Sequence, residues 1–530
     1  MRLPIKHLSA RVPWHDRRWD GSVCDNPLDN SFCRVLPMID AAKDVEFECS
    51  YCKEKFCDMD SLPPCASEKG SFMSSFEYHR ILEHNYKTRG NKLFKDFLAA
   101  RFTCKPYSFN AVPFRWMLKG KDDNSSEMAQ IYGLDYDPDK EETITEKLGF
   151  ASSWVQDRDN QRELLDSFFG CLEPRKSLVF FYARHTPLSE IGVRVLIGVA
   201  YITHVGDIID FAYPKGYKGH RAYVWDRLIQ HSLRDPEDGC ILPYHELIQY
   251  ETENPDDSYL CRDCVVEVPE YSQFSHASEL VENDTSIDAL FAMQTSLQKA
   301  SKILDIDYSK QLEWLDNAIS RVWDMRGAFP SMGSVLSAKQ FGNGNSIAWY
   351  IDQYIIDTYG DIYAADAWEV FNEAVYGKIE VPRVKITKTM HTQWNRAISD
   401  EDKLKMRLLS RIQMDNGQAE YALETQGLIK NPYILFETSR RDSVQISFSS
   451  IDKAMYPSPV ISSRFPLTET EPFDDNLDIR RIRALVVSIL ENDADRGNTL
   501  VVEGELIDAC CTMTLSAPTP LTAQLMESYS

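Results

Sequence analysis

Two apolar runs rich in β-branched and aromatic residues constrain the fold of this chain most. They are SLVFFYARHTPL at 177–188 and RVLIGVAYITHVGDIIDFAY at 194–213. Runs of this composition, separated by proline and polar residues, are typical of adjacent strands. A helix is expected just before them, over 160–169, and the pattern becomes helical after 283. The sequence therefore predicts an α+β protein with strands in the middle of the chain.

The length of 530 residues predicts several folding units, because one domain usually takes about 100–200 residues. Changes in composition indicate four units: a cysteine-rich one at 1–119, a mixed α/β one at 149–283, a helical one at 284–380, and a final one at 385–530 that combines helices with short strands. The polar, acidic segment 120–148 is expected to be a loop or linker.

Composition and charge exclude several classes of protein. No stretch approaches the roughly 18 uninterrupted apolar residues of a membrane span, and the first residues lack the apolar core of a secretory signal. We therefore expect a cytoplasmic protein with no membrane partner. The net charge of −23 disfavours a surface covered by nucleic acid. A negative net charge is still compatible with a local basic groove, because salt screens the interaction between charges more than about 10 Å apart.

Six cysteines are concentrated near the start of the chain, at Cys24, Cys33, Cys49, Cys52, Cys57 and Cys65. In a chain with no export signal they indicate reduced thiols or metal ligands rather than disulfides. Cys49 and Cys52 have the knuckle spacing with which two thiolates hold one zinc ion. His79 and His84 follow on an expected helix, within reach of one metal.

A second candidate ligand set consists of Cys24, Cys33 and Cys65, each in a turn-like setting, with His15 as the fourth ligand. Rigid turns around the ligands are what a closed metal site needs. We therefore expect a zinc-stabilised head. The alternative is that these cysteines are small, buried hydrophobic residues.

The two middle strands resemble the strand pairs of PUA-like barrels, including EVE-type modules that read modified bases. Leu196-Ile197-Gly198-Val199-Ala200 carries the likeness. The resemblance implies a small β-barrel with a pocket in which a single-stranded or flipped base stacks. The candidate stacking residues are Trp154, Phe181, Tyr182 and Tyr201, and Arg184 is the candidate phosphate or base contact. Alternatively, these aromatic residues fill the core. The basic, glycine-bearing loop 214–221 suits a turn that faces phosphate, or is a solvated hairpin.

The segment Phe329-Pro330-Ser331-Met332-Gly333 resembles the turn of helix-hairpin-helix DNA-binding proteins. In that family glycine permits close approach of the backbone to a DNA phosphate, so Gly333 is a candidate DNA contact. Ser331 occupies the position of the first glycine of the family pattern. The alternative is a simple corner between two helices.

Two segments near the end of the chain resemble RecD-like superfamily 1 DNA helicases. GLIKNPYILF at 427–436 is similar to the "NPY-x-L" segment of that family. In that family a helix and a "G-x-T" turn come after this segment, and the residues 478–509 are similar to them. The matching residues are Arg481, Arg483, Gly497 and Thr499. The head and the middle unit are similar to the N-terminal extension of some bacterial RecD-like exonuclease/helicase proteins, the head in RVPWHD and the middle unit in SLVFFYA.

That resemblance implies a pre-motor region with a terminal winged-helix-like element and Arg481 and Arg483 as DNA contacts. In those bacterial proteins an ATPase motor follows. Here the only P-loop-like pair, Gly120-Lys121, is followed by Asp122 and lacks the glycine cradle. We therefore expect no ATP hydrolysis by this chain alone.

The leading hypothesis is a DNA-engaging accessory or targeting module for single-stranded or tailed DNA. It would act with a RecD-like helicase or nuclease partner, and the resemblance suggests antiviral or foreign-DNA defence. A basic stripe with interleaved aromatic residues supports it, with Lys92, Lys95, Arg101 and Lys105 as candidate contacts. The alternative is a solvated helix face with an apolar inner stripe.

Two alternatives remain open. The first is a metal-dependent nuclease subunit, in which Asp207 and Asp210 follow a strand and Lys215 lies nearby. The second is a non-catalytic scaffold whose acidic surface docks a partner protein.

Overall fold

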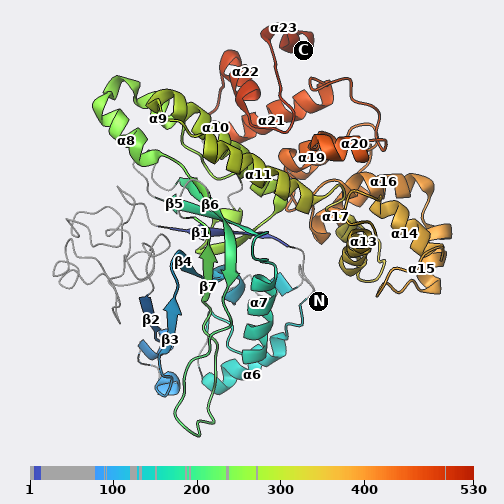
Figure 1. Cartoon of the computed structure of the whole chain (residues 1–530). Helices are drawn as coiled ribbons and strands as arrows, with labels where there is room; N and C mark the ends of the chain where they lie inside the picture. The colour runs from blue at the N-terminus through green and yellow to red at the C-terminus, as the bar shows by residue number, and fades with distance from the viewer. Residues whose placement is uncertain are drawn as a thin grey trace. The chain divides into compact units, whose positions relative to one another are not determined.

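The computed structural model describes residues 5–12, 78–88, 90, 92–119, 128–129, 134–149, 152–184, 188–189, 193–233, 238–269, 272–495 and 497–529. The chain divides into two compact units, here called the sheet unit, which ends at Ile319, and the helical unit, which begins at Ser320. Strands and helices are both present, as the sequence predicts (Figure 1).

The sheet unit is built on a sheet with the strand order β4-β7-β6-β5-β1-β9, and β8 pairs with β6 away from this path. The sheet curls into half a barrel (Figure 1). Its strands are β1 (His7–Arg11), β4 (Ser108–Ala111), β5 (Leu178–Arg184), β6 (Arg194–Val205), β7 (Arg227–His231), β8 (Gly239–Ile241) and β9 (Ser278–Val281). A separate two-stranded sheet pairs β2 (Tyr78–Leu82) with β3 (Ala100–Cys104).

The predicted pairing of the two apolar runs is confirmed, because β5 and β6 are antiparallel neighbours. The second run ends as a strand at Val205, and residues 206–226 form the connection to β7. β1, from the head of the chain, lies parallel to β5, with Leu8 opposite Val179, and antiparallel to β9. The sheet therefore takes strands from both the 1–119 and the 149–283 segments.

Helices of the sheet unit are α3 (Asn85–Thr88), α4 (Phe114–Met117), α6 (Pro138–Leu148), α7 (Arg158–Gly170), α8 (Tyr244–Glu253), α9 (Ser258–Arg262), α10 (Asn283–Leu304) and α11 (Ser309–Arg326), which continues into the helical unit. The helix expected over 160–169 is α7. The loop or linker expected over 120–148 is wrong for residues 138–148, because they form the helix α6. Asp137 caps this helix by accepting hydrogen bonds from the N–H groups of Asp139 and Lys140, and Pro138 suits its first turn.

The helical unit contains α12 (Met332–Ala338), α13 (Gly344–Tyr359), α14 (Ala367–Val375), α15 (Lys388–Thr392), the π-helical η6 (Gln393–Ala397), α16 (Asp400–Ser410), α17 (Asn416–Glu424), α18 (Ile434–Ser439), α19 (Phe448–Met455), α20 (Pro459–Arg464), α21 (Ile479–Asp495), α22 (Glu503–Thr512) and α23 (Ala523–Tyr529). The short strands expected here are absent from its described residues, 320–495 and 497–529. Residues 498–502, which connect α21 to α22, are irregular.

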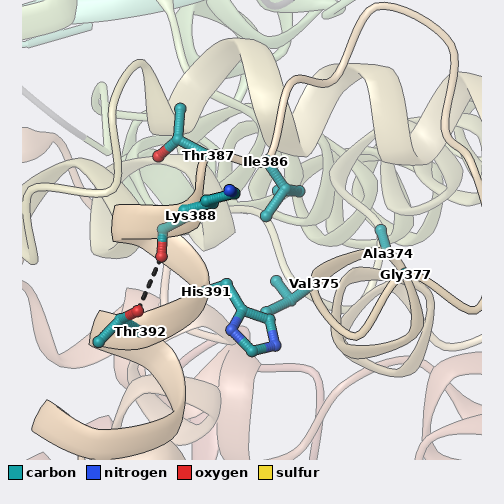
Figure 2. Close-up of a pocket in the computed structure, with 8 residues that line it drawn as sticks. All are labelled: Ala374, Val375, Gly377, Ile386, Thr387, Lys388, His391 and Thr392. Carbon is teal, nitrogen blue, oxygen red and sulfur yellow. Dashed lines mark hydrogen bonds between the residues drawn. The ribbon is translucent and has the colours of Figure 1, made fainter.

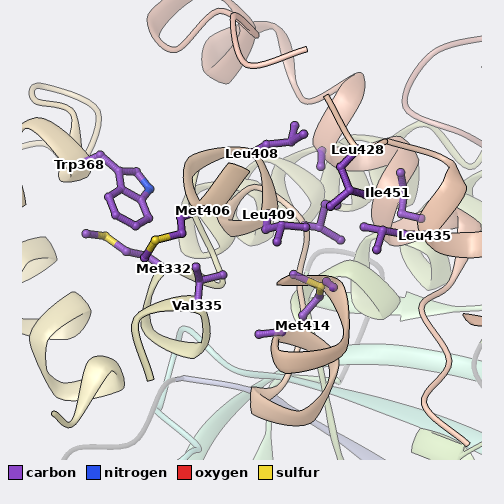
Figure 3. Packing of buried hydrophobic residues seen from close by; sticks show 14 of the residues in the cluster. Met332, Val335, Trp368, Met406, Leu408, Leu409, Met414, Leu428, Leu435 and Ile451 are labelled. Atoms are coloured by element: carbon purple, nitrogen blue, oxygen red, sulfur yellow. The ribbon is translucent and has the colours of Figure 1, made fainter. Parts of the chain in front are cut away.

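The core of the helical unit is a continuous apolar cluster. Figure 3 shows Met332 and Val335 of α12 close to Met406 and Leu409 of α16 and to Met414. Capping boxes at Ser399 and Asp415 begin α16 and α17 by satisfying N–H groups of the first turn. Packing and capping together explain why this part of the chain is helical despite its ordinary composition.

Candidate nucleic-acid interface

The predicted zinc ligands lie outside the described residues. They are His15, Cys24, Cys33, Cys49, Cys52 and Cys65. Their binding of zinc therefore stays a prediction. In the described ranges, no three His, Cys, Asp or Glu side chains are grouped so as to hold a metal ion. The helix expected at His79 is wrong, because this residue lies in β2.

Two basic segments that are far apart in sequence meet at one end of the sheet unit. The long β6–β7 connection extends beyond the sheet beside β2 and β3 (Figure 1). Leu98 forms a β-bridge with Ala212, and its N–H donates to the Ala212 carbonyl at 2.8 Å. Phe97 packs edge-on against Tyr213, with ring centroids 5.1 Å apart. The segment 92–98 and the loop 213–221 are therefore one surface.

The cations of this surface, which we call the basic rim, are Lys92, Lys95, Lys215, Lys218 and Arg221. All five are exposed. Within the described part of the chain, none of the five has a carboxylate oxygen within 4 Å. Asp96 is an acidic residue of the same surface, and the pKa of Tyr217 is raised by burial and then by this carboxylate. Unpaired cations keep their charge available for an anionic partner.

The loop that carries three of these cations has a fixed conformation. The Tyr213 hydroxyl accepts from the Ala222 N–H at 2.9 Å and donates to its carbonyl at 3.1 Å, which closes the loop. Tyr217 stacks on Tyr213 with ring centroids 5.1 Å apart and planes at 7°. The Arg221 guanidinium lies over Tyr213 at 5.3 Å. The loop thus presents partly exposed aromatic surface beside its cations.

Gly219 leaves room for the Tyr217 side chain in this arrangement. A Cβ atom at this position would lie 2.3 Å from the hydroxyl oxygen of Tyr217 and 2.5 Å from its Cζ. Any larger residue would displace the Tyr217 ring from its place over the loop backbone. Glycine is commonly used where other groups approach the backbone this closely.

An aromatic cluster lies beneath the rim and fixes it to the body of the unit. His84 is buried and stacks on Phe94, with ring centroids 4.3 Å apart and planes at 10°. Its Nδ1 accepts from the Tyr86 N–H at 3.2 Å. Burial, with the neighbouring His220, lowers the pKa of His84 to about 3. His84 is therefore neutral at physiological pH and is part of the packing.

Arg101 and Lys105 of the predicted stripe are exposed, on β3 and directly after it. Phe94 is completely buried, so its ring supports the rim from below. Lys92 and Lys95 are exposed on and after the single turn η3 (Lys92–Phe94). The stripe is thus short and irregular rather than a helix face.

The structure does not bring the four predicted base-stacking residues together. Phe181 and Tyr182 are both 0% exposed on β5, so neither ring offers a face to a base in this structure. Tyr201 packs against Trp314, with centroids 5.3 Å apart, while Trp154 packs against Tyr86 at 5.7 Å. Phe181 and Tyr182 are therefore core residues, whereas Trp154 and Tyr201 are half-buried.

The other predicted DNA contacts differ in accessibility. Arg184 is exposed at the end of β5, and Arg483 is exposed on α21, where its Nε lies 3.0 Å from Glu437 Oε1. Arg481 is 0% exposed. Gly333 is buried where α12 meets α13, and its Cβ position is occupied by Asn345. Neither Arg481 nor Gly333 has surface to offer a phosphate in this structure.

The helical unit also contains a pocket that none of the predicted sites includes. Its volume is about 480 Å³, and it is lined by Ala374, Val375, Gly377, Ile386, Thr387, Lys388, His391 and Thr392 (Figure 2). The available signal was the charge of the surrounding segment. Residues 376–398 contain five Lys or Arg and a single acidic residue, Glu380, in a chain of net charge −23.

Comparison with known proteins gives this chain no relative: no family model, no curated protein and no solved structure matches it. Across the described residues, every helix is too short or too polar to cross a lipid bilayer.

Proposed function

We propose that this chain is a DNA-engaging accessory module that holds single-stranded or tailed DNA for a RecD-like motor on another polypeptide. The observation that supports it best is the basic rim. Two segments separated by more than a hundred residues are joined by the Leu98–Ala212 bridge, so that unpaired cations and the stacked pair Tyr213 and Tyr217 belong to one surface. Basic residues beside aromatic platforms are the usual means of binding single strands without sequence preference.

The overall acidity of the chain favours a localised contact over a general one. With a net charge of −23, most of the surface repels a polyanion, and strand binding is restricted to places where cations have no acidic partner. The rim meets that condition. It also contains Gly216 with φ +80° and Gly219 close to Tyr217, which give the loop the specific shape described above.

The motor partner and the defence role are proposed from the sequence resemblance. Its two C-terminal segments meet in the structure, since Tyr433 of the "NPY" segment and Arg481 of the arginine-bearing helix both hydrogen-bond to Asp452. This contact supports treating them as one element. A pull-down with a RecD-like helicase, with and without DNA, tests the partnership.

The nuclease alternative receives no such support. The Asp210 carboxylate pairs with Arg158 on α7, and Asp207 is exposed on the β6–β7 connection. Cleavage of labelled DNA by the purified chain with Mg²⁺ or Mn²⁺, lost in Asp207→Ala, would favour the nuclease instead. A scaffold role is favoured if the chain binds the helicase partner but no DNA.

The decisive test is a fluorescence anisotropy titration of a labelled single-stranded oligonucleotide at several salt concentrations. Binding should weaken steeply with salt, and Lys215→Glu/Lys218→Glu should lower the slope of log K against log salt by roughly 1.4, about 0.7 for each lost phosphate contact.

The matched control is Arg262→Glu/Lys302→Glu, which makes the same change of charge at two exposed positions of the sheet unit outside the rim. It should leave the slope unchanged. Equal effects of the two double variants would mean that only net charge matters, and absence of binding at low salt would refute the proposed function.

A further inference from the structure

The pocket of the helical unit has two walls of different chemistry. Ala374 and Val375, at the end of α14, and Ile386 provide an apolar wall, whereas Lys388 and His391 on α15 provide a polar one (Figure 2). No carboxylate is among the eight lining residues. An apolar wall facing a cationic one suits a ligand that has a flat apolar part and an anionic part.

The polar wall is held in place by local hydrogen bonds. Thr392 Oγ1 donates to the Lys388 carbonyl at 2.9 Å, the dashed line of Figure 2. Asn395 Nδ2 donates to the His391 carbonyl at 2.9 Å and lies 3.1 Å from His391 Nε2. Because this amide nitrogen is a donor, Nε2 accepts and Nδ1 carries the hydrogen. His391 therefore keeps a second donor on a ring that lines the pocket.

Unpaired positive charge surrounds the pocket. Five exposed cations lie on or next to its lining segments: Lys378, Arg383, Lys385, Lys388 and Arg396. Throughout the described ranges, none of them forms an ion pair with a carboxylate within 4 Å. Tyr376 beside the pocket is 48% exposed, and its ring meets that of His391 edge-on, with centroids 6.3 Å apart. An exposed aromatic ring is thus available next to the cations.

From these features we infer that the pocket holds one nucleotide of a single strand. The phosphodiester would lie at Lys388 and His391, the base against Ile386 and the exposed ring of Tyr376, and the neighbouring phosphates near the other cations. The volume of about 480 Å³ is within the range of small-ligand sites, although such a site usually encloses more of its ligand. An open pocket suits a strand that enters and leaves.

This inference rests on the proposed function only in its choice of ligand, because the pocket and the basic rim belong to different units. The two sites share no residue. They can therefore fail separately, and the experiment has to report where on the chain a strand lies.

The test is photo-crosslinking of the full chain to a single-stranded oligothymidylate that carries one 4-thiothymidine, followed by mass spectrometry of the adducts. We expect adducts on peptides that contain 374–392. Lys388→Glu/His391→Ala should abolish them and weaken oligonucleotide binding at least about tenfold, because both groups that would hold the phosphodiester are removed.

Lys430→Glu serves as the control, since Lys430 is an exposed lysine of the same unit that does not line the pocket. It should retain the adducts. Adducts confined to the segments of the basic rim would overturn the nucleotide pocket and leave the proposed function standing. Adducts at 374–392 without any on the rim would support the pocket and overturn the role of the rim. Absence of both adducts and binding would overturn both.

Discussion

The guanidinium of Arg481 holds the carboxylate of Asp452 through two hydrogen bonds, Nε to Oδ1 at 2.7 Å and Nη2 to Oδ2 at 3.0 Å. Both side chains are buried. The remaining Arg481 N–H groups donate to the carbonyls of Asn476 and Ala517 and to Thr519 Oγ1. Every donor of this guanidinium is therefore satisfied inside the protein, which is the condition under which a buried charge is tolerated.

Arg481→Met should destabilise the helical unit by about 3–5 kcal/mol, because it leaves the Asp452 carboxylate buried without its cation. Hydrogen exchange of the full chain should show reduced protection of the amides in α19 and α21, while protection in the strands of the sheet unit stays unchanged. Unchanged protection together with weaker DNA binding would instead make Arg481 a DNA contact.

The control is Arg483→Met, the same substitution two positions further along α21. The Arg483 side chain is 68% exposed and pairs with Glu437 at 3.0 Å. Exposed ion pairs contribute only about 0–1 kcal/mol, so protection of α19 and α21 should hardly change.

Gly333→Ala should also destabilise the helical unit. The added Cβ would lie 2.7 Å from the Cα and 2.5 Å from Oδ1 of Asn345, and backbone cannot move away cheaply. Overpacking of this kind costs typically about 1–3 kcal/mol. Urea unfolding of the variant, followed by hydrogen exchange in α12 and α13, measures the effect.

Gly504→Ala is the matched substitution for this test. Gly504 lies in α22, and a Cβ there meets nothing within 4 Å, so alanine should stabilise the helix slightly, by up to about 1 kcal/mol. If Gly333 instead faces a phosphate, Gly333→Ala would weaken DNA binding and leave unfolding unchanged.

The burial of His7 should make the stability of the sheet unit decrease in acid. It is completely buried, its Nδ1 accepts from the Leu178 N–H at 2.9 Å, and Nε2 lies 2.9 Å from Asn283 Oδ1. Burial lowers its pKa from 6.5 to about 4, although the Asn283 hydrogen bond opposes the shift. Below pH 6.5 the unfolded chain therefore binds a proton that the folded one does not, and stability falls as pH decreases to about 4.

The contribution of this histidine to that loss is roughly 3 kcal/mol over the whole interval. His7→Gln should flatten the dependence of the urea midpoint on pH between 6.5 and 4, at the cost of some stability at pH 7. An unaltered profile in His7→Gln would mean that other groups set the acid sensitivity.

Local pattern predicts much of the secondary structure and little of how the segments meet. The runs at 177–188 and 194–213 form neighbouring strands because their side chains favour extended backbone and burial. The helix at Pro138–Leu148 was missed because its composition is polar, yet Asp137 followed by Pro138 is a helix-start signal in the sequence itself.

Contacts between distant segments could not be predicted in the same way. Pairing of β1 with β5, and of Leu98 with Ala212, joins positions far apart in the chain, and a single sequence contains no local signal for such contacts. Charge alone likewise does not reveal burial. Arg481 and Arg483 look alike in sequence, but the first is enclosed by five hydrogen bonds and the second is on the surface.

Gly219→Ala tests whether the aromatic part of the basic rim contributes to strand binding. The added Cβ would collide with the Tyr217 hydroxyl oxygen, so the substitution should displace the Tyr217 ring while leaving every cation in the sequence. Stacking of a base on an aromatic side chain is worth about 1–3 kcal/mol, so affinity for a single-stranded oligonucleotide should fall about fivefold or more. The salt slope should stay unchanged, because no phosphate contact is lost.

Gly170→Ala, where a Cβ meets nothing within 4 Å, should bind as the unaltered chain does. A lower slope in Gly219→Ala would show that the loop acts by placing its cations, whereas unaltered affinity would exclude Tyr217 as a stacking platform.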